Sequence, residues 1–343
     1  MPSKLSADSR TDGSRNMLLL DADFVDTFNT LFRKEIPFVF VIDFDGKYPV
    51  IFPVHSAGQE EILYDFHSDG ERFTNTPDTP KAVISYSASH VCWRRYQSAF
   101  RYVQDQLNMG ESYLANLTFP SRFHTDATLS EIYHASRAPY RLCYKNRFTV
   151  FSPERFIRID GGHISTNPMK GTIDASLPDA RKRLMDDMKE AAEHLTIVDL
   201  LRNDLSRVCS SVEVTRYRYC ETIRSYTGEL VQTSSLIRGM LHDSYIDRPA
   251  HILQALLPAG SVTGAPKKRT IEIIKHAEGY DRGYYTGIFG FCRTKVIDSA
   301  VIIRYIENHA ASMFFKSGGG ITVYSNPVSE YEEMKNKVYV PVC

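Results

Sequence analysis

Short apolar runs along the chain predict β-strands. Residues 38–44 (FVFVIDF) and 48–54 (YPVIFPV) flank an Asp-Gly turn, which is the pattern of a β-hairpin. Other runs are either wholly apolar or alternate apolar with polar residues over the length of a strand. Further strands are therefore predicted at 147–153, 155–160, 211–219, 284–292, 299–306 and 312–316.

Other apolar residues recur at the spacing of a helix. Tyr96, Phe100 and Leu107 predict one helix together with Val103, and Gly110 would end it. A second, long helix is predicted from residue 180 to about residue 206. Its apolar stripe would comprise Met188, Ala191, Ala192, Leu195, Val198, Leu201 and Leu205.

Further helices and the order of the elements indicate the fold class. Prolines open helices predicted at 249–258 and 265–279, and a last helix is predicted at 326–338. Strands and helices are interspersed without a regular βα alternation, which favours the α+β class over a doubly wound sheet. No linker rich in Pro, Gly or Ser divides the chain, so one large domain over 17–343 is expected after a polar, disordered tail at 1–16.

Composition limits the classes of function. The 343 residues are 43% hydrophobic and 24% charged, as in ordinary globular proteins, and 41 basic residues balance 41 acidic ones. Without net charge, the molecule has no overall field that favours nucleic acid or an anionic membrane. The six cysteines are scattered without a CxxC pair, and no apolar run approaches the roughly 20 residues that span a bilayer. A cytoplasmic protein with reduced thiols is expected.

Two pairs of glutamates form the first candidate site. Glu190 and Glu193 are spaced i, i+3 within the long predicted helix, and Glu330 and Glu333 repeat that spacing in the last helix. Residues at this spacing share one helix face. Each pair alone could be a solvated surface, but two pairs brought together could hold a hard cation such as Mg²⁺ through oxygen ligands.

Lys170 is the second candidate. In the stretch STNPMKGTID (165–174), Pro168 fixes a backbone angle and Gly171 lets another part of the chain approach closely, so a tight loop is expected. A lysine in such a loop is either a solvated cation or a positioned amine. These residues alone leave both interpretations open.

Glycine-rich stretches and one arginine could bind an anion. GSVTGAPKKR (260–269) lacks the spacing of a nucleotide-binding P-loop, but it leads into a helix N-terminus whose N–H groups suit an anionic ligand. SGGGI (317–321) is either a flexible turn or a close approach of backbone to a ligand. Arg304 interrupts the apolar run 299–306, so it either points to water or pairs with a substrate carboxylate. RND (202–204) is interpreted as a helix-end ion pair.

Taken in order, these motifs resemble the chorismate-utilising enzymes, the family of anthranilate, aminodeoxychorismate, isochorismate and salicylate synthases. The resemblance covers roughly residues 90–340. It implies a single α+β domain, a β-sandwich of two sheets with helices outside and the site between the sheets. It rests on SPERF (152–156), PMKGT (168–172), KEAAEHLTIVDLLRNDLSRVC (189–209), GSVTGAPK (260–267), YYTGIFG (284–290), IIRY (302–305), SGGGI and EYEEMKNKV (330–338).

Within this family, the lysine at position 170 resembles component I of the aminodeoxychorismate synthases, whereas the anthranilate and isochorismate branches have alanine there. The resemblance implies that Lys170, as a neutral amine, attacks C2 of chorismate and expels the C4 hydroxyl, with Glu154 as the general acid. Ammonia would then attack C4 and expel the lysine. Because a lysine must lose its proton before it attacks, its pKa would have to be lowered by burial or by neighbouring cations.

The resemblance also implies ligands for Mg²⁺ and for the substrate. Glu193 and Glu333 would bind the metal directly, and Glu190 and Glu330 would act mainly through waters. Ammonia would come from a separate glutamine amidotransferase, and a separate aminodeoxychorismate lyase would act on the product. The implied substrate-binding residues are Thr172, Thr263, Lys267, Tyr285, Arg304, Gly318, Gly319, Gly320 and Lys337.

Some positions depart from the family pattern. Leu114 stands where amine-transferring relatives usually carry glutamine and water-adding ones lysine, which argues against isochorismate chemistry. Gln232 stands where many members have a pocket histidine. The chain ahead of the motifs is shorter than in typical members, so insensitivity to tryptophan is expected. The alternatives are an anthranilate synthase and a chorismate-binding protein that has lost catalysis.

Overall fold

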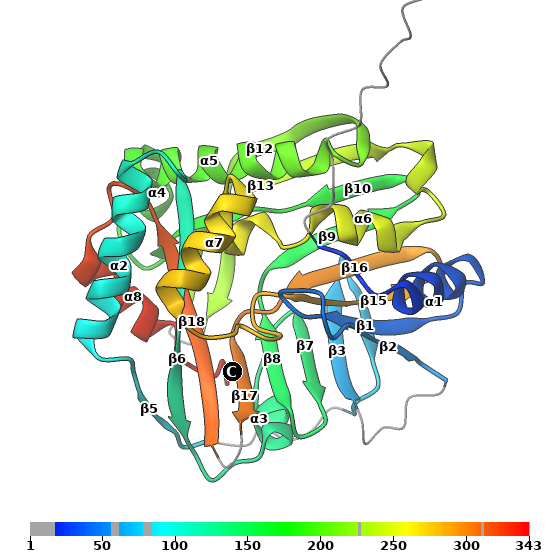
Figure 1. Cartoon of the computed structure of the whole chain (residues 1–343), viewed down its shortest axis with the longest axis horizontal. Helices are drawn as coiled ribbons and strands as arrows, with labels where there is room; N and C mark the ends of the chain where they lie inside the picture. The colour runs from blue at the N-terminus through cyan, green and yellow to red at the C-terminus, as the bar shows by residue number, and fades with distance from the viewer. Residues whose placement is uncertain (1–17, 56–61, 78–83, 226–227, 310–311, 343) are drawn as a thin grey trace, which may run out of the picture.

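The computed structural model describes residues 18–55, 62–77, 84–225, 228–309 and 312–342. Its strands form two sheets in which neighbouring strands run antiparallel, and helices surround them (Figure 1). The predicted α+β class, with a sandwich of two sheets and helices outside, is confirmed. The tail predicted at 1–16 lies outside the described residues.

The two sheets are built from strands far apart in sequence. The first has the order β11 (Met169–Asp174), β13 (Gly228–Leu241), β10 (His163–Thr166), β9 (Arg155–Asp160), β16 (Val296–Val301), β15 (Ile288–Arg293), β1 (Phe38–Ile42) and β2 (Val50–Pro53), with β12 (Cys209–Ser225) paired to β13. The second has the order β14 (Gly264–Ala265), β6 (Leu114–His124), β18 (Ser312–Ile321), β17 (Tyr305–His309), β8 (Phe148–Ser152), β7 (Tyr140–Tyr144), β3 (Ile62–Ser68) and β4 (Glu71–Thr74), with β5 (Ser87–Ser89) paired to β6.

Helices cover the outer faces and ends of the sheets. In Figure 1, α2, α7 and α8 lie beside β6 and β18, and α1 lies on the opposite side of the molecule near β1. No helix in the described part of the chain is long and apolar enough to cross a membrane. The helices are α1 (Ala22–Arg33), α2 (Trp93–Asn108), α3 (Leu129–Ala135), α4 (Ala180–Asp186), α5 (Met188–Leu205), α6 (Pro249–Leu256), α7 (Lys267–Glu278) and α8 (Pro327–Asn336).

Strand β1 shows how the sandwich buries its core. Successive side chains of a strand point to opposite faces of the sheet. Val39 and Val41 lie in the buried cluster that the two sheets share. Phe38 and Phe40 contact Phe28 of α1 instead, with ring centroids 4.8 and 5.0 Å apart from the Phe28 ring. Because both faces of this strand are covered, its sequence is apolar throughout, and the predicted hairpin of β1 with β2 is confirmed.

The prediction of one long helix from 180 to 206 is wrong. It is two helices, α4 and α5, separated at Asp187. Asp187 has an extended backbone conformation, and its side chain accepts a hydrogen bond of 3.0 Å from the backbone N–H of Glu190, so it caps α5. The predicted apolar stripe is partly wrong as well, since Met188 and Leu195 are 81% and 57% exposed.

The single strand predicted at 299–306 is also wrong. β16 ends at Val301 in the first sheet, and β17 begins at Tyr305 in the second sheet. Between them Arg304 has a φ of +53°, in the left-handed region that is uncommon for residues other than glycine. The chain crosses from one sheet to the other here, and an apolar run by itself gives no sign of such a crossing.

Two stretches expected to be loops or turns lie in strands. Lys170 belongs to β11, where Gly171 has a φ of +78° and the pairing with β13 shifts register between Lys170 and Thr172. Such a bulge re-aims the side chains beside it. The glycines of 317–321 belong to β18 and pair with β6 along their whole length, so the flexible-turn interpretation is wrong.

Candidate active site

Lys170 and Glu193 form the centre of the candidate site. Lys170 projects from β11, Glu193 projects from α5, and Lys170 Nζ lies 2.8 Å from Glu193 Oε2. Gly171 permits the close approach of the helix, because a Cβ there would lie 2.8 Å from Glu190 Oε2. The hydroxyl of Thr233 donates a hydrogen bond to the Lys170 carbonyl and so fixes the backbone at the bulge. The amine is therefore positioned, and it is paired with a carboxylate.

The charge state of Lys170 differs from the sequence-based expectation. Burial disfavours the ammonium form, but the carboxylates of Glu193, Glu333 and Glu190 outweigh it and raise the pKa of Lys170. The expected lowering of this pKa is thus wrong for the structure described here. Neighbouring anions, contributed by two different helices, reverse the effect that burial alone would have.

A second lysine–glutamate pair lies at the C-terminal end of α8, where Lys337 follows the last helical residue. Lys337 Nζ is 2.7 Å from Glu333 Oε1 and donates to the Gly318 carbonyl at 2.9 Å. A Cβ at Gly319 would lie 3.4 Å from Glu330 Oε2 and 3.8 Å from Glu333 Oε1, so β18 passes close to both carboxylates. The glycine allows the strand to run directly beneath this helix face.

The four glutamates of α5 and α8 belong to one electrostatic cluster. Burial and the charge of Glu193 raise the pKa of Glu190. Burial also raises the pKa of Glu330, and the negative charges of Glu333 and Glu193 raise it further. Lys337 holds the pKa of Glu333 below its ordinary value despite burial. Among the described residues, no three His, Cys, Asp or Glu side chains are grouped closely enough to hold a metal ion.

Glu154 lies between β8 and β9, where its backbone is fixed on both sides. Its N–H donates to Ser152 Oγ at 3.2 Å, and its carbonyl accepts from the Val301 N–H at 3.1 Å. Burial raises the pKa of the Glu154 carboxyl, and a hydrogen bond from Ser261 together with the charges of Lys170, Lys337 and Arg304 offsets part of that rise. A carboxyl with a raised pKa keeps its proton to higher pH, which suits a group that donates a proton.

Two buried donors of the site have no partner within the described residues. They are Nε of Arg304 and Nε2 of Gln232. The Arg304 guanidinium lies 5.1 Å from the centroid of the Tyr339 ring, which restricts its direction. Gln232 pairs through its backbone with Thr172 of β11. Buried donors normally find an acceptor, so these two fit a ligand that carries oxygen acceptors.

Lys267 lies apart from this cluster of charges. Its Nζ is 2.7 Å from Asp204 Oδ2 and 2.7 Å from the Leu256 carbonyl oxygen, and both side chains of the ion pair are buried. Burial lowers the pKa of Lys267 and raises that of Asp204. The RND stretch thus contributes a buried ion pair between α5 and α7, where the sequence suggested a pair within one helix end. Ser261 is not among the predicted site residues, although it lies within the GSVTGAPK motif.

The remaining predicted residues lie in different environments. Thr263 is buried and donates to the Ala259 carbonyl at 2.8 Å. The ring of Tyr285 is buried in the core between the sheets. Thr172 is exposed on β11. A Cβ at Gly320 would lie 3.1 Å from Leu114 Cδ1, so Leu114 covers this glycine.

Comparison with known proteins identifies the family of this chain. Its sequence matches the chorismate binding enzyme family over residues 55–342. The chain belongs to this family. A protein of Haemophilus influenzae described as an uncharacterized PabA-like protein is 43% identical over 320 residues, which are 93% of this chain and 96% of that protein.

Relatives with described activities are more distant. Aminodeoxychorismate synthase component 1 of Salmonella typhimurium is 35% identical over 278 residues, which cover 76% of this chain and 59% of that protein. The structure of anthranilate synthase component I from Streptococcus pneumoniae has a TM-score of 0.62 and 27% identity, and covers 77% of this chain and 60% of that one. The menaquinone-specific isochorismate synthase of Escherichia coli has a TM-score of 0.71 at 17% identity, covering 92% and 79%, which shows a shared fold.

Proposed function

We propose that this chorismate-binding enzyme aminates chorismate at C4 to give 4-amino-4-deoxychorismate. The observation that carries the proposal is the positioned amine of Lys170, 2.8 Å from Glu193 within the charged cluster that also influences Glu154. The relatedness to aminodeoxychorismate synthase component 1 supports the same reaction. Anthranilate synthase is the second candidate, supported by the similarity of the fold, and a lysine at position 170 argues against it.

The proposed chemistry uses Lys170 as a nucleophile and Glu154 as an acid. Lys170 Nζ forms a bond to C2, both double bonds of the ring diene shift toward C4, and the C4 hydroxyl leaves as water with the proton of Glu154. Ammonia then bonds to C4, both double bonds shift back, and the bond between C2 and Lys170 Nζ breaks to release the lysine. The sum is chorismate plus ammonia giving 4-amino-4-deoxychorismate plus water. General acid catalysis of this kind contributes about 10²–10⁴-fold.

The amine of Lys170 has to lose its proton before it reacts. In the structure the carboxylates of Glu193, Glu333 and Glu190 favour its ammonium form. A second cation bound to these carboxylates would offset their negative charge and so lower the pKa of Lys170. The buried donors of Arg304 and Gln232 would meanwhile orient the carboxylates and oxygens of the substrate.

Mg²⁺ suits the oxygen chemistry of the four glutamates, although among the described residues no three of them are grouped closely enough to hold the ion. Glu190, Glu193, Glu330 and Glu333 supply carboxylate oxygens, which this cation prefers, and two of them are neutralised by lysines in the structure. We propose that Glu193 and Glu333 hold the ion directly, with Glu190 and Glu330 acting mainly through waters. When bound, the ion supplies positive charge to offset the substrate's ring carboxylate.

We propose separate chains for the neighbouring steps and a cytoplasmic location. A glutamine amidotransferase would supply ammonia, and an aminodeoxychorismate lyase would process the product. The proposals of a separate amidotransferase and a separate lyase rest on the relatedness to aminodeoxychorismate synthase component 1. Free ammonium salts should therefore support turnover by the purified chain alone.

Product identity tests the proposed function. Purified protein is incubated with chorismate, an ammonium salt and Mg²⁺, in parallel with EDTA, and products are identified by liquid chromatography with mass spectrometry. We expect 4-amino-4-deoxychorismate with Mg²⁺ and a loss of about 10³-fold or more in Lys170→Ala, as for the removal of a nucleophile. Lys182→Ala, which removes an exposed lysine of α4, is the matched control and should keep full activity.

A covalent adduct would identify the nucleophile directly. Enzyme quenched with chorismate and Mg²⁺ but without ammonia should carry an added mass on the peptide that contains Lys170. Anthranilate or isochorismate as the main product would refute the proposed reaction. No product from chorismate under any of these conditions would favour a binding protein that has lost catalysis. Full activity of Lys170→Ala would remove the lysine from the mechanism.

A further inference from the structure

Arg218 lies beside the break between α4 and α5. Both helices pack against β13, and α5 also packs against β11 and β12 (Figure 1). The pairing of β12 with β13 shifts register between Arg216 and Tyr219, and Arg218 inside this bulge has a φ of +42°. Such a conformation is uncommon for residues other than glycine, and a bulge re-aims the side chains beside it. The Arg218 side chain points to the two helices and is buried.

The Arg218 guanidinium joins the end of α4 to the start of α5. Its Nη1 donates to the Met185 carbonyl at 2.8 Å. Its Nη2 donates to the carbonyls of Leu184 at 2.9 Å and Asp187 at 3.2 Å. The last carbonyls of a helix lack partners within it, and the helix dipole favours a cation there. Asp187 is also the residue that caps α5, so one side chain fixes both sides of the break.

A second link joins Arg218 to the middle of α5 through Ser235 of β13. The Arg218 N–H donates to Ser235 Oγ at 2.8 Å, and the same oxygen lies 2.6 Å from Nε2 of His194. His194 is fully buried and directly follows Glu193 on α5. The Ser235 N–H donates to the Pro168 carbonyl at 3.0 Å, in the segment that leads into β11. Ser235 thus holds both α5 and the approach to β11.

These polar links matter because apolar packing secures only the second part of α5. The buried residues of this helix begin at His194. Residues 188–193, which include Glu193, are exposed or half-buried. Burial of apolar surface therefore contributes little to holding them in place. Their position depends on the anchors at Asp187 and His194, which lie on either side of them.

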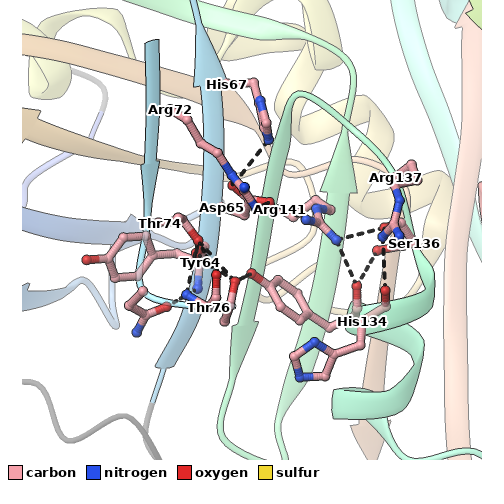
Figure 2. A network of polar contacts seen from close by, with 12 residues as sticks. Tyr64, Asp65, His67, Arg72, Thr74, Thr76, His134, Ser136, Arg137 and Arg141 are labelled. Carbon is pink, nitrogen blue, oxygen red and sulfur yellow. Dashed lines mark hydrogen bonds and ion pairs between the residues drawn. The ribbon is translucent and has the colours of Figure 1, made fainter. Parts of the chain in front are cut away.

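Capping of a helix end is one explanation for such an arginine, and α3 provides an example (Figure 2). At the end of α3, Arg141 donates to the carbonyls of Tyr133 at 3.2 Å and Ser136 at 2.7 Å. The chain then continues into β7, and the described residues of that strand are not part of the candidate active site. Arg218 differs, because the carbonyl of Asp187 lies beyond the end of α4 and at the start of α5.

We propose that Arg218 is a positioning residue, which fixes the start of α5 and so holds the Glu193 carboxylate against the Lys170 amine. That pair joins α5 to β11 at 2.8 Å. In the part of the chain that is described, Arg218 hydrogen-bonds neither Glu193 nor Lys170, so it acts through the helix. The kinetic consequence rests on the function proposed above, since it requires that the Lys170 amine reacts. The anchoring of α5 does not depend on that function.

Steady-state kinetics of Arg218→Gln tests the proposal. Glutamine is neutral and too short to reach all three carbonyls. With chorismate, an ammonium salt and Mg²⁺, kcat should fall about ten-fold or more while KM for chorismate changes less than about three-fold, because a displaced reacting group slows the chemical step. Without ammonia, the adduct on Lys170 should form more slowly by a similar factor. Circular dichroism verifies that the variant is folded at the assay temperature.

A second variant and a matched control separate positioning from stability. Arg218→Lys keeps the positive charge at the end of α4 but replaces the two-armed guanidinium by one nitrogen, so it should lose kcat with a smaller loss of stability. Arg181→Gln is the control, because Arg181 also joins α4 to β12. Its Nη1 donates to the Cys220 carbonyl at 3.2 Å and its Nη2 to Thr222 Oγ1 at 2.7 Å. Neither bond involves α5, so kcat and KM should be unchanged.

Hydrogen exchange of the full chain tests the anchoring without the reaction. The backbone amides of 188–196 should exchange about ten-fold faster or more in Arg218→Gln, and at the unaltered rate in Arg181→Gln. Unchanged exchange in Arg218→Gln would overturn the proposal. So would an equal loss of kcat in Arg181→Gln, a loss that appears in KM instead of kcat, or faster exchange with kcat within about two-fold of the unaltered chain.

The same measurements separate this proposal from the proposed function. If the unaltered chain forms no 4-amino-4-deoxychorismate, the proposed function fails. Faster exchange of 188–196 in Arg218→Gln would then still support the anchoring of α5 by this arginine, and unchanged exchange would overturn it.

Discussion

The buried pair of Lys267 and Asp204 provides a quantitative test of the structure. Family resemblance suggested that Lys267 binds substrate, whereas the structure places its Nζ 2.7 Å from Asp204 Oδ2. At an effective dielectric constant of about 20, the attraction between two charges at 2.7 Å is about 6 kcal/mol before desolvation is subtracted. Asp204→Asn keeps the size of the side chain and removes that attraction. It leaves a buried ammonium without its partner.

In Asp204→Asn the Lys267 ammonium either stays charged without its partner or loses its proton. The response with the lower free-energy cost sets the loss of stability. Breaking a buried pair typically costs about 3–5 kcal/mol. Alternatively Lys267 gives up its proton, which from an ordinary pKa of 10.5 costs about 5 kcal/mol at pH 7 and about 2 kcal/mol at pH 9. The unfolded variant then binds one proton more than the folded variant, so its stability rises with pH. We expect a loss of about 3–5 kcal/mol at pH 7 that shrinks to about 2 kcal/mol at pH 9.

Urea unfolding followed by circular dichroism at pH 7 and pH 9 measures this loss. Asp199→Asn is the matched control, because Asp199 is 75% exposed on the same helix and pairs with Arg202 at 3.3 Å. A surface pair of this kind contributes at most about 1 kcal/mol. A loss below about 1 kcal/mol in Asp204→Asn, or an equal loss at both pH values, would refute the buried pair. A raised KM for Asp204→Asn with unchanged stability would instead support a role for Lys267 in binding substrate.

Two further predictions concern the walls of the candidate site. Glu154→Gln should abolish amination yet stabilise the fold, because burial raises the folded pKa of Glu154 and so disfavours its ionised carboxylate. The gain in stability should grow as the pH rises to that folded pKa. Thermal unfolding between pH 5 and pH 8 tests this, and a destabilised variant would contradict it. Gly318→Ala should destabilise the protein by about 1–3 kcal/mol or more, since its Cβ would lie 2.2 Å from the Leu117 carbonyl oxygen. Gly319→Ala, whose Cβ would lie 3.4 Å from Glu330, is the control and should cost little stability in the same urea assay.

Local sequence pattern predicted the elements whose environment is uniform along their length. The helix of Tyr96 and Phe100 corresponds to α2, and Gly110 follows it with a φ of +77°. The hairpin around the Asp-Gly turn is β1 and β2. Each of these segments has one or two apolar faces that continue from end to end. The periodicity of apolar residues is therefore enough to predict the element.

Pattern failed where a single residue changes the direction of the chain. Asp187 caps α5 and divides an otherwise continuous helical pattern. Arg304 takes a left-handed conformation between two strands that belong to different sheets. Neither event alters the average polarity of the segment. Both depend on the partners that the flanking residues find elsewhere in the fold.

The candidate site shows the same division. Sequence motifs drew attention to Lys170, Glu154 and the two glutamate pairs, because each is a short run with recognisable chemistry. Their electrostatics came only from the tertiary structure. Burial by itself would lower the pKa of Lys170, and the carboxylates of Glu193 and Glu333, carried on helices α5 and α8, raise it instead. The sign of that shift depends on distances between elements that are remote in sequence, and Coulomb interactions over such distances leave no local pattern.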